Sequence, residues 1–267
     1  MKESNPLVSI IMTVYNGMPY LKDSISSLAK QTYENTEIII IDDGSNDESA
    51  STIISFKNRF ENIKLYKSVR IGRSKALNLG LKKSKGKYIA INDSDDLSMP
   101  DRIKKQVNFL EKNKDYVMVG SMIKLYDLLS KKIFDDNFYN RPVNDFEIKR
   151  FFFEGQPIQH STVMYRRNEA LKIGMYNNIN FLIDRDFFIR ISDEGKLYNL
   201  NLPLVHIGRG DNQYFRTKYK GKNRRFQDLK FRIISSFKFN SNLRTKIKLI
   251  MLLFWVYIPN NIKKFIK

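Results

Sequence analysis

Short runs of β-branched and apolar residues alternate with helical patterns in the N-terminal part of the chain, and this alternation limits the folds open to it. Each apolar run has the length and composition of a buried strand. The runs are Val8–Tyr15, Glu37–Ile41, Ile63–Tyr66 and Tyr88–Ile91. Strands that alternate with helices form parallel pairs, because each helix carries the chain back to the same end of the sheet. We therefore predict an α/β, Rossmann-like fold with a mainly parallel central sheet flanked by helices.

Polar and acidic residues follow these runs at their carboxyl ends, where open α/β sheets usually bind ligands. Thr13 and Tyr15 end the first run, and Asp43 follows the second. The fourth run ends in three acids, Asp93, Asp95 and Asp96. Carboxylates are the ligands that Mg²⁺ and Mn²⁺ prefer, usually together with phosphate oxygens. The acids therefore indicate a metal-diphosphate site, although an acidic turn or a helix cap is a purely structural alternative for each of them.

Two further groups of residues could take part in such a site. A basic loop with Arg70 and Lys75 follows the third run, and its cations either meet phosphates or are solvated. Asp184 precedes an apolar helical pattern, so it is expected at a helix N-terminus, where the helix dipole favours a carboxylate. For Asp184 the structural alternative is helix capping.

The charge of the chain is concentrated at its C-terminus. Residues 216–267 hold 15 Lys and Arg against the single acid Asp228, so they carry +14 of the net charge of +19. Such a segment is expected to meet a polyanion, either nucleic acid or an anionic membrane. The apolar run Ile247–Ile258 is too short to cross a bilayer and suits a helix in the membrane interface, or one packed on the domain. The chain has no Cys, which excludes disulfides and thiolate metal sites.

Five segments of the chain occur in a fixed order. They are Val8–Gly17, Ser26–Tyr33, Glu37–Asp47, Ala76–Gly80 and Asn92–Arg102. Together they resemble the ordered blocks of glycosyltransferase family 2. The resemblance implies the GT-A fold, a nucleotide-activated sugar donor and inversion at the anomeric carbon.

The resemblance also implies roles on the nucleotide side of the site. Thr13 and Tyr15 match the strand end that lies against the base, and Asp43 matches the acid that reads its edge. Nucleotide contacts are further implied for Arg70, Asp93 and Asp95, and divalent metal ligation for Asp95 and Asp96. Arg70 stands where the family often has Asn, and a cation there suits a diphosphate.

On the catalytic side, the resemblance implies that Asp184 is the base, with Asp186 as the alternative. His160 lines the acceptor site or is a satisfied histidine at the start of a strand. His206 and Arg209 are candidates, with Lys75, for contacts to the diphosphate. Ile183 departs from the family pattern, which often has Glu at that place.

Together with the resemblance, these features predict that the chain is an inverting glycosyltransferase that depends on a divalent metal, Mn²⁺ or Mg²⁺. It would move a sugar from a nucleotide-diphosphate donor, by family frequency a UDP-sugar, to a hydroxyl of a lipid-linked saccharide in bacterial capsule, O-antigen or wall polysaccharide synthesis. The chain is expected in the cytoplasm, peripheral at the inner face of the membrane and without a nucleic-acid partner. The alternatives are a nucleic-acid-binding protein and a sugar nucleotidyltransferase.

Three parts are expected along the chain. Residues 1–98 form the nucleotide-sugar-binding half of the GT-A domain, and residues 99–215 form its acceptor-binding and catalytic half. Residues 216–267 form a basic, helical C-terminal extension.

Overall fold

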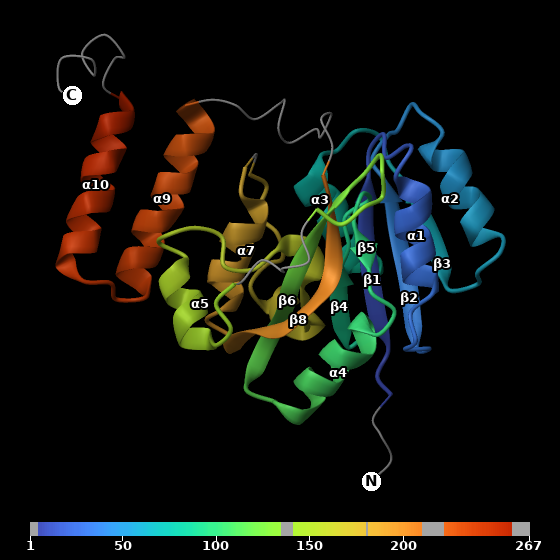
Figure 1. Cartoon of the computed structure of the whole chain (residues 1–267), viewed down its shortest axis with the longest axis horizontal. Helices are drawn as coiled ribbons and strands as arrows, with labels where there is room; N and C mark the ends of the chain where they lie inside the picture. Colours follow the sequence, from blue (N-terminus) through green and yellow to red (C-terminus); the bar gives the residue numbers. More distant parts are fainter. Residues whose placement is uncertain (1–4, 135–140, 180, 210–221, 258–267) are drawn as a thin grey trace.

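The computed structural model describes residues 5–134, 141–179, 181–209 and 222–257. Within them, eight strands form one sheet in the order β3-β2-β1-β4-β7-β6-β8-β5 (Figure 1). The strands are β1 (Val8–Val14), β2 (Thr36–Asp42), β3 (Ile63–Lys67), β4 (Tyr88–Ile91), β5 (Leu97–Ser98), β6 (Tyr116–Asp127), β7 (Met164–Arg166) and β8 (Lys196–Arg209).

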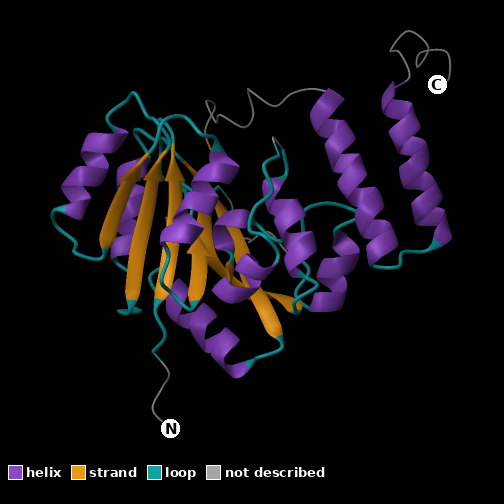
Figure 2. Ribbon diagram, turned by 180° about the vertical axis from the view of Figure 1, so that it is seen from behind, coloured by secondary structure: helices purple, strands orange, loops and turns teal. Residues whose placement is uncertain are grey.

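Helices cover both faces of this sheet (Figure 2). They are α1 (Leu21–Ala29), α2 (Ser49–Lys57), α3 (Arg73–Lys83), α4 (Arg102–Lys112), α5 (Asp145–Phe151), α6 (Arg167–Lys172), α7 (Ile183–Ile191), α9 (Lys222–Lys238) and α10 (Leu243–Tyr257). On one face, Ile11 of β1 packs with Leu77 and Leu81 of α3. On the other face, Ile10 of β1 packs with residues of α1, α2 and α4. Because β1 to β4 are buried on both faces, their sequences read as continuous apolar runs.

The N-terminal half of the sheet is parallel, as the alternation of strands and helices predicts. β1 pairs in parallel with β2 and β4, and β2 pairs in parallel with β3. Val14 lies opposite Asp42, so β1 and β2 end at the same level. The residues that follow these strands therefore come together at one edge of the sheet.

The second half makes the sheet mixed. β7 is antiparallel to both β4 and β6, whereas the long strands β6 and β8 are parallel to each other. β5 pairs antiparallel with β8, where Leu97 lies opposite His206. Of the seven pairings between these strands, four are parallel.

One segment of this half departs from its local sequence pattern. Gln156 to Arg167 has a strand-like pattern, yet only Met164–Arg166 pairs as a strand, and His160–Thr162 forms a 3₁₀ turn. Donors from α4 and β4 satisfy the carbonyl groups of this segment. Gln106 donates to the carbonyl oxygen of Thr162, and that of Val163 accepts from Arg102 and from the backbone N–H of Ile91 in β4.

Among the described residues of the C-terminal extension, 222–238 and 243–257 are helical, in line with the expected helical character. α9 packs against α5 and α7, and α10 packs against α9 at one end of the molecule (Figure 1). We call α9 and α10 the C-terminal hairpin. No helix in the described ranges combines the length and the apolar character that crossing a bilayer requires.

Candidate active site

The loop between β3 and α3 is held by the buried carboxylate of Asp43, which follows β2. Asp43 Oδ1 accepts the backbone N–H of Ile71 at 2.7 Å, and Oδ2 accepts that of Gly72 at 3.0 Å. Gly72 has φ 88°, a conformation that favours glycine, and α3 starts directly after it. Asp43 therefore fixes the position of the basic loop and of the first residue of α3.

Arg70 and Tyr15 meet at the same edge of the sheet. The Arg70 guanidinium carbon lies 3.0 Å from the centroid of the Tyr15 ring, and Arg70 Nε lies 4.0 Å from Asp43 Oδ2. Thr13 lies opposite Ile41 near the end of β1. The structure thus brings together Tyr15, Asp43 and Arg70, three residues expected to contact a nucleotide.

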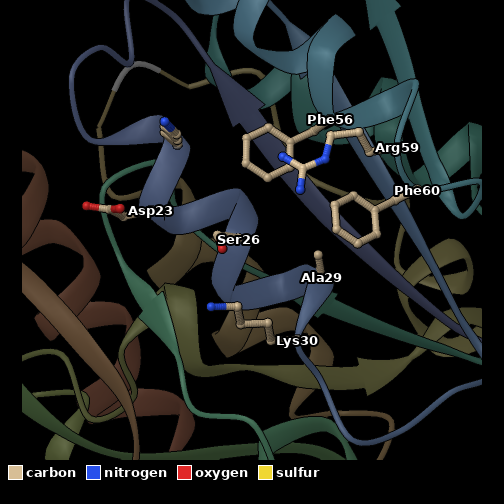
Figure 3. Close-up of a pocket in the computed structure, with 8 residues that line it drawn as sticks. Asp23, Ser26, Ala29, Lys30, Phe56, Arg59 and Phe60 are labelled. Carbon is tan, nitrogen blue, oxygen red and sulfur yellow. The ribbon is translucent and has the colours of Figure 1, made fainter.

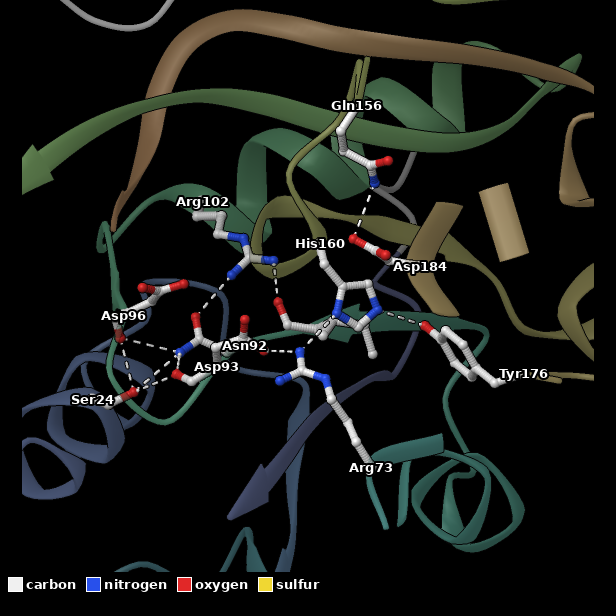
Figure 4. Close-up of polar contacts among 11 residues, drawn as sticks. Ser24, Arg73, Asn92, Asp93, Asp96, Arg102, Gln156, His160, Tyr176 and Asp184 are labelled. Carbon is white, nitrogen blue, oxygen red and sulfur yellow. Dashed lines mark hydrogen bonds and ion pairs between the residues drawn. The ribbon is translucent and has the colours of Figure 1, made fainter. Parts of the chain in front are cut away.

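The turn after β4 is held mainly through its backbone. Ser24 of α1 donates to the carbonyl oxygens of Asp93 and Asp96 at 3.0 and 2.8 Å, and Asn92 donates to the same two oxygens. Tyr126 donates to the carbonyl oxygen of Asp95 at 2.9 Å. These contacts to backbone carbonyl oxygens hold the turn, and Figure 4 draws those made by Ser24 and Asn92.

Asp96 is the most buried acid of this turn, with 3% of its surface exposed. Burial is the main cause that raises the pKa of its carboxyl group well above the usual range, and the charges of Asp95 and Asp93 raise it further. Its Oδ1 accepts the backbone N–H of Gly208 at 3.1 Å. A cation would stabilise such a crowded group of carboxylates.

The donor atoms here fit a hard divalent ion. All are carboxylate oxygens, and Mg²⁺ in particular usually binds one or two carboxylates together with phosphate oxygens and water. No cluster of three or more acidic, His or Cys side chains with metal-site geometry exists among the described residues. An ion held by Asp95 and Asp96 would therefore need further ligands from a bound diphosphate.

The turn after β4 carries Asp93, Asp95 and Asp96, and we call it the acidic turn. Arg73, the first residue of α3, connects this turn to His160. Its Nη2 donates to Asp93 Oδ1 at 2.6 Å and lies 3.2 Å from His160 Nδ1. His160 Nε2 lies 3.0 Å from the Tyr176 hydroxyl. Because a guanidinium can only donate, Nδ1 accepts, and the proton of a neutral ring is on Nε2. Burial, followed by the charge of Arg73, lowers the pKa of His160 to about 4, so this histidine is neutral near pH 7.

The neutral state of His160 predicts a pH dependence of stability. An unfolded histidine titrates near 6.5, so between that value and about 4 the unfolded chain binds the additional proton and stability falls as the pH falls. We expect His160 to lower the free energy of unfolding by about 2 kcal/mol between pH 7 and pH 5. Urea unfolding of wild type and His160→Gln at both pH values measures this. Equal losses in the two proteins would contradict the assignment.

Asp184 lies in the first turn of α7 and approaches the same network. Its Oδ2 accepts a hydrogen bond from Gln156 Nε2 at 3.0 Å, and its Oδ1 accepts the backbone N–H of Arg185 at 2.9 Å. The charge of Asp184 is among the influences that raise the pKa values of Arg73 and His160, against the effect of burial. Asp184 and the acidic turn therefore act on the same two side chains from different segments of the chain (Figure 4).

Asp186 has a different environment, although it is only two residues from Asp184. Its Oδ2 accepts hydrogen bonds from Nε and Nη2 of Arg190 at 2.9 and 2.7 Å and from Asn177 Nδ2 at 3.0 Å. Arg190 also donates to the carbonyl oxygens of Ile173 and Met175. Asp186 thus helps to join α7 to the segment that follows α6.

The residues expected at a diphosphate lie in two places. His206 is on β8 opposite Lys124 of β6, and burial followed by the charge of Lys124 lowers its pKa. Arg209 ends β8 next to Gly208, which binds Asp96. Lys75 is exposed on α3. The continuation of the loop after Arg209, at residues 210–221, lies outside the described residues.

Arg73, Gln156 and Tyr176 belong to the site, but the sequence alone does not predict this. In the sequence, Arg73 is one of several cations in a basic loop, and Gln156 is a polar residue before Pro157. Their contacts join segments that are 16 to 87 positions apart in the sequence. Local pattern alone does not reveal such contacts.

A cavity of about 270 Å³ is lined by residues of α1, of α2 and of the turn after α2 (Figure 3). Its lining includes Lys22, Asp23, Lys30, Phe56, Arg59 and Phe60. None of the candidate site residues lines it. The cavity is therefore a space between two surface helices and not part of the candidate site.

Comparison with known proteins relates this geometry to a family. The model of glycosyl transferase family 2 matches residues 9–174. The putative glycosyltransferase EpsE of Bacillus subtilis is 32% identical over 221 residues, which are 80% of this chain and 77% of that protein.

Two solved structures are similar in fold. S. aureus TarS 1-349 in complex with UDP-GlcNAc superposes with a TM-score of 0.69 at 17% identity, over 92% of this chain and 71% of that one. The mannosyltransferase PcManGT of Pyrobaculum calidifontis, in complex with GDP-Man and Mn²⁺, gives a TM-score of 0.65 at 18% identity, over 97% and 72% of the two chains. The chain belongs to glycosyl transferase family 2, and its mixed sheet with flanking helices is the GT-A fold.

Proposed function

We propose that this glycosyltransferase moves a sugar, with inversion, from a nucleoside diphosphate donor to a hydroxyl of a saccharide acceptor. One observation carries the proposal: the acids of the turn after β4 and Asp184 both interact with Arg73 and His160. Leaving-group stabilisation and proton removal need charged groups on two sides of one reaction centre. The family assignment favours sugar transfer over nucleic-acid binding or nucleotidyl transfer.

Tyr15, Asp43 and Arg70 would hold the nucleotide, which we propose is UDP. The similar structures contain UDP-GlcNAc and GDP-Man, and both ligands are nucleoside diphosphate sugars. In this chain the Tyr15 ring is covered by Arg70, and both Asp43 oxygens accept backbone N–H groups of the loop. A base that stacks on Tyr15 and bonds to Asp43 must therefore displace the loop of residues 68–72.

Asp95 and Asp96 would hold Mn²⁺ or Mg²⁺ on the diphosphate, with Asp93 contacting the ribose. When bound, the ion stabilises the negative charge that develops on the leaving diphosphate. The raised pKa of Asp96 supports this assignment, because a buried acid beside two others gains most from a neighbouring cation. Lys75, His206 and Arg209 would provide further positive or donor groups for the phosphates.

Asp184 would be the base, in preference to Asp186. Asp184 accepts hydrogen bonds from one amide side chain and one backbone N–H, whereas Asp186 accepts three from Arg190 and Asn177. A carboxylate already engaged by a guanidinium is a weaker proton acceptor. One base that directs the acceptor hydroxyl to the face opposite the leaving diphosphate produces inversion. His160 is neutral and would line the acceptor side.

We propose further that the acceptor is lipid-linked and that the enzyme works at the inner face of the cell membrane, in capsule, O-antigen or wall polysaccharide synthesis. The outer side of α10 supports this, because Leu243, Ile247 and Met251 are 71%, 48% and 65% exposed there. Arg244 and Lys248 are exposed on the same helix. Apolar side chains flanked by cations are typical of helices that lie in an anionic membrane interface.

A thermal-shift panel tests the proposed donor. UDP-, GDP-, CMP- and dTDP-sugars are added to the full chain with and without Mn²⁺. A donor present at 100 times its Kd stabilises the folded state by about 2.7 kcal/mol, so the true donor should raise the Tm clearly, and only with the metal. A shift with UDP-sugars supports the proposal. A panel without any nucleotide-dependent shift would contradict it.

The membrane proposal predicts the effect of a single charge on α10. Met251→Glu places a carboxylate on its exposed apolar side, and we expect binding to phosphatidylglycerol vesicles to weaken by about 10-fold or more. Co-sedimentation with vesicles measures this. Leu129→Glu is the matched control, because Leu129 is 74% exposed but lies in the turn after β6. Equal binding by Met251→Glu and wild type would contradict docking through α10.

A further inference from the structure

The C-terminal hairpin holds helix α7 at both of its ends. Near the start of α7, Arg185 Nη1 lies 2.5 Å from Asp228 Oδ1 of α9. Near its end, Lys238 of α9 donates to the carbonyl oxygen of Ile189 at 2.8 Å and to Asp193 Oδ2 at 2.6 Å. Three polar contacts, one near the start of α7 and two near its end, therefore align α9 with α7.

Apolar packing lies between these two contacts. Phe231 of α9 and the nearby Phe239 pack against the core cluster that includes Phe187 and Phe188 of α7. Phe239 also stacks on Phe152, with 5.8 Å between ring centroids. The hairpin is thus joined to the core beneath α7 and is more than a surface appendage.

Arg185 is a charged residue with only 1% of its surface exposed. Burial lowers its pKa, while the charge of Asp228 has the opposite effect. A buried cation that loses its counter-ion is strongly unfavourable, so the side chain would move toward water. The position of Arg185 therefore depends on Asp228, the single acid in residues 216–267.

Arg185 directly follows Asp184, and its backbone N–H donates to Asp184 Oδ1. The first turn is also held by Gln156, which donates to Asp184, and by the contacts of Asp186 with Arg190 and Asn177. The residue before the helix, Leu182, has φ 55° and provides no side-chain hydrogen bond to cap it. A movement of Arg185 would consequently displace the carboxylate of Asp184 relative to Arg73 and His160.

We propose that Asp228 is a positioning residue for the catalytic helix: by holding Arg185 it sets the place of Asp184. This inference rests on the role of Asp184 in the proposed function. It makes the C-terminal hairpin part of the catalytic machinery in addition to a membrane contact. Removal of the hairpin should then reduce transfer even to a water-soluble acceptor with no bilayer present.

The test compares Asp228→Asn with wild type in a transfer assay on a soluble acceptor. We expect kcat to fall about 10- to 100-fold, because small displacements of a catalytic group have effects of this size. The donor Kd should stay within about twofold, since β1 to β4 are not touched. Asp228→Glu should recover most of kcat. The matched control is Asp115→Asn, which removes an exposed ion pair with Lys196 at the start of β8, away from the first turn of α7, and should leave kcat nearly unchanged.

The temperature of the assay separates positioning from a loss of stability. Transfer is measured where melting curves show that both proteins are fully folded, so a lower kcat there reports a displaced Asp184 and not a smaller folded fraction. An unchanged kcat in Asp228→Asn would overturn the proposal, as would an equal loss of kcat and donor binding.

Hydrogen exchange gives a readout that does not depend on sugar transfer. The amides of residues 183–191 should exchange faster in Asp228→Asn, while those of β1 and β2 remain as slow as in wild type. If exchange is faster in Asp228→Asn but the wild-type protein transfers no sugar, the contact between Asp228 and Arg185 holds the helix and the proposed function is rejected. Unchanged exchange in an active enzyme would reject the positioning role alone.

Discussion

Asp184→Asn is expected to lower kcat about 1,000-fold while the donor Kd stays within about twofold. The amide keeps the size of the side chain and its hydrogen bond to Arg185, but it cannot accept a proton from the acceptor hydroxyl. General base catalysis contributes about 10²- to 10⁴-fold to a rate. Initial rates of transfer give kcat, and thermal shifts with the donor give its affinity.

Asp186→Asn is the matched control for this experiment. It weakens the contact with Arg190, so we expect a lower Tm but a kcat within about tenfold of wild type. The two variants make the same chemical change two residues apart. If Asp184→Asn retained full activity while Asp186→Asn lost it, the base would be Asp186.

Asp96→Asn should separate activity from stability. Loss of one proposed metal ligand is expected to reduce transfer about 100-fold or more and to remove the dependence of donor binding on Mn²⁺. The metal-free protein should instead become more stable at pH 8. Because burial and the neighbouring acids raise the pKa of Asp96, the wild-type group destabilises the fold as the pH rises through that pKa, and asparagine does not.

The control for Asp96→Asn is Asp101→Asn, which alters an exposed acid at the start of α4 that pairs with Lys105. Its effects on transfer and on Mn²⁺ dependence should be small. Melting curves without and with Mn²⁺ and a UDP-sugar measure all of these effects. A metal response in Asp96→Asn equal to that of wild type would show that the ion binds elsewhere.

The N-terminal half of the fold could be predicted from the sequence because local signals and burial agree there. The apolar runs at β1 to β4 lie between helices, so their periodicity and length are sufficient to identify them. Parallel pairing then brings the acids that follow β2 and β4 to one edge. Neither the strand positions nor their parallel pairing depends on the contacts made by each carboxylate.

The second half was less predictable because contacts distant in the sequence decide it. Phe146 and Phe152 belong to one aromatic-rich stretch, yet Phe146 is 68% exposed, whereas Phe152 is fully buried. Phe146 lies in the first turn of helix α5 and Phe152 follows its last residue. The turns of the helix between them place the two rings on different sides. The pairing of Arg185 with Asp228 likewise joins positions 43 residues apart, and no local pattern marks them as partners.

In the proposed mechanism, acids from separate segments share one metal-diphosphate site that faces Asp184. Anomalous diffraction from crystals of the full chain grown with UDP and Mn²⁺ can locate that site. We expect a single strong manganese peak at the carboxylates of Asp95 and Asp96, with the diphosphate bound to it and the uracil near Tyr15 and Asp43. A nucleotide bound elsewhere, or a manganese peak remote from these carboxylates, would contradict the mechanism.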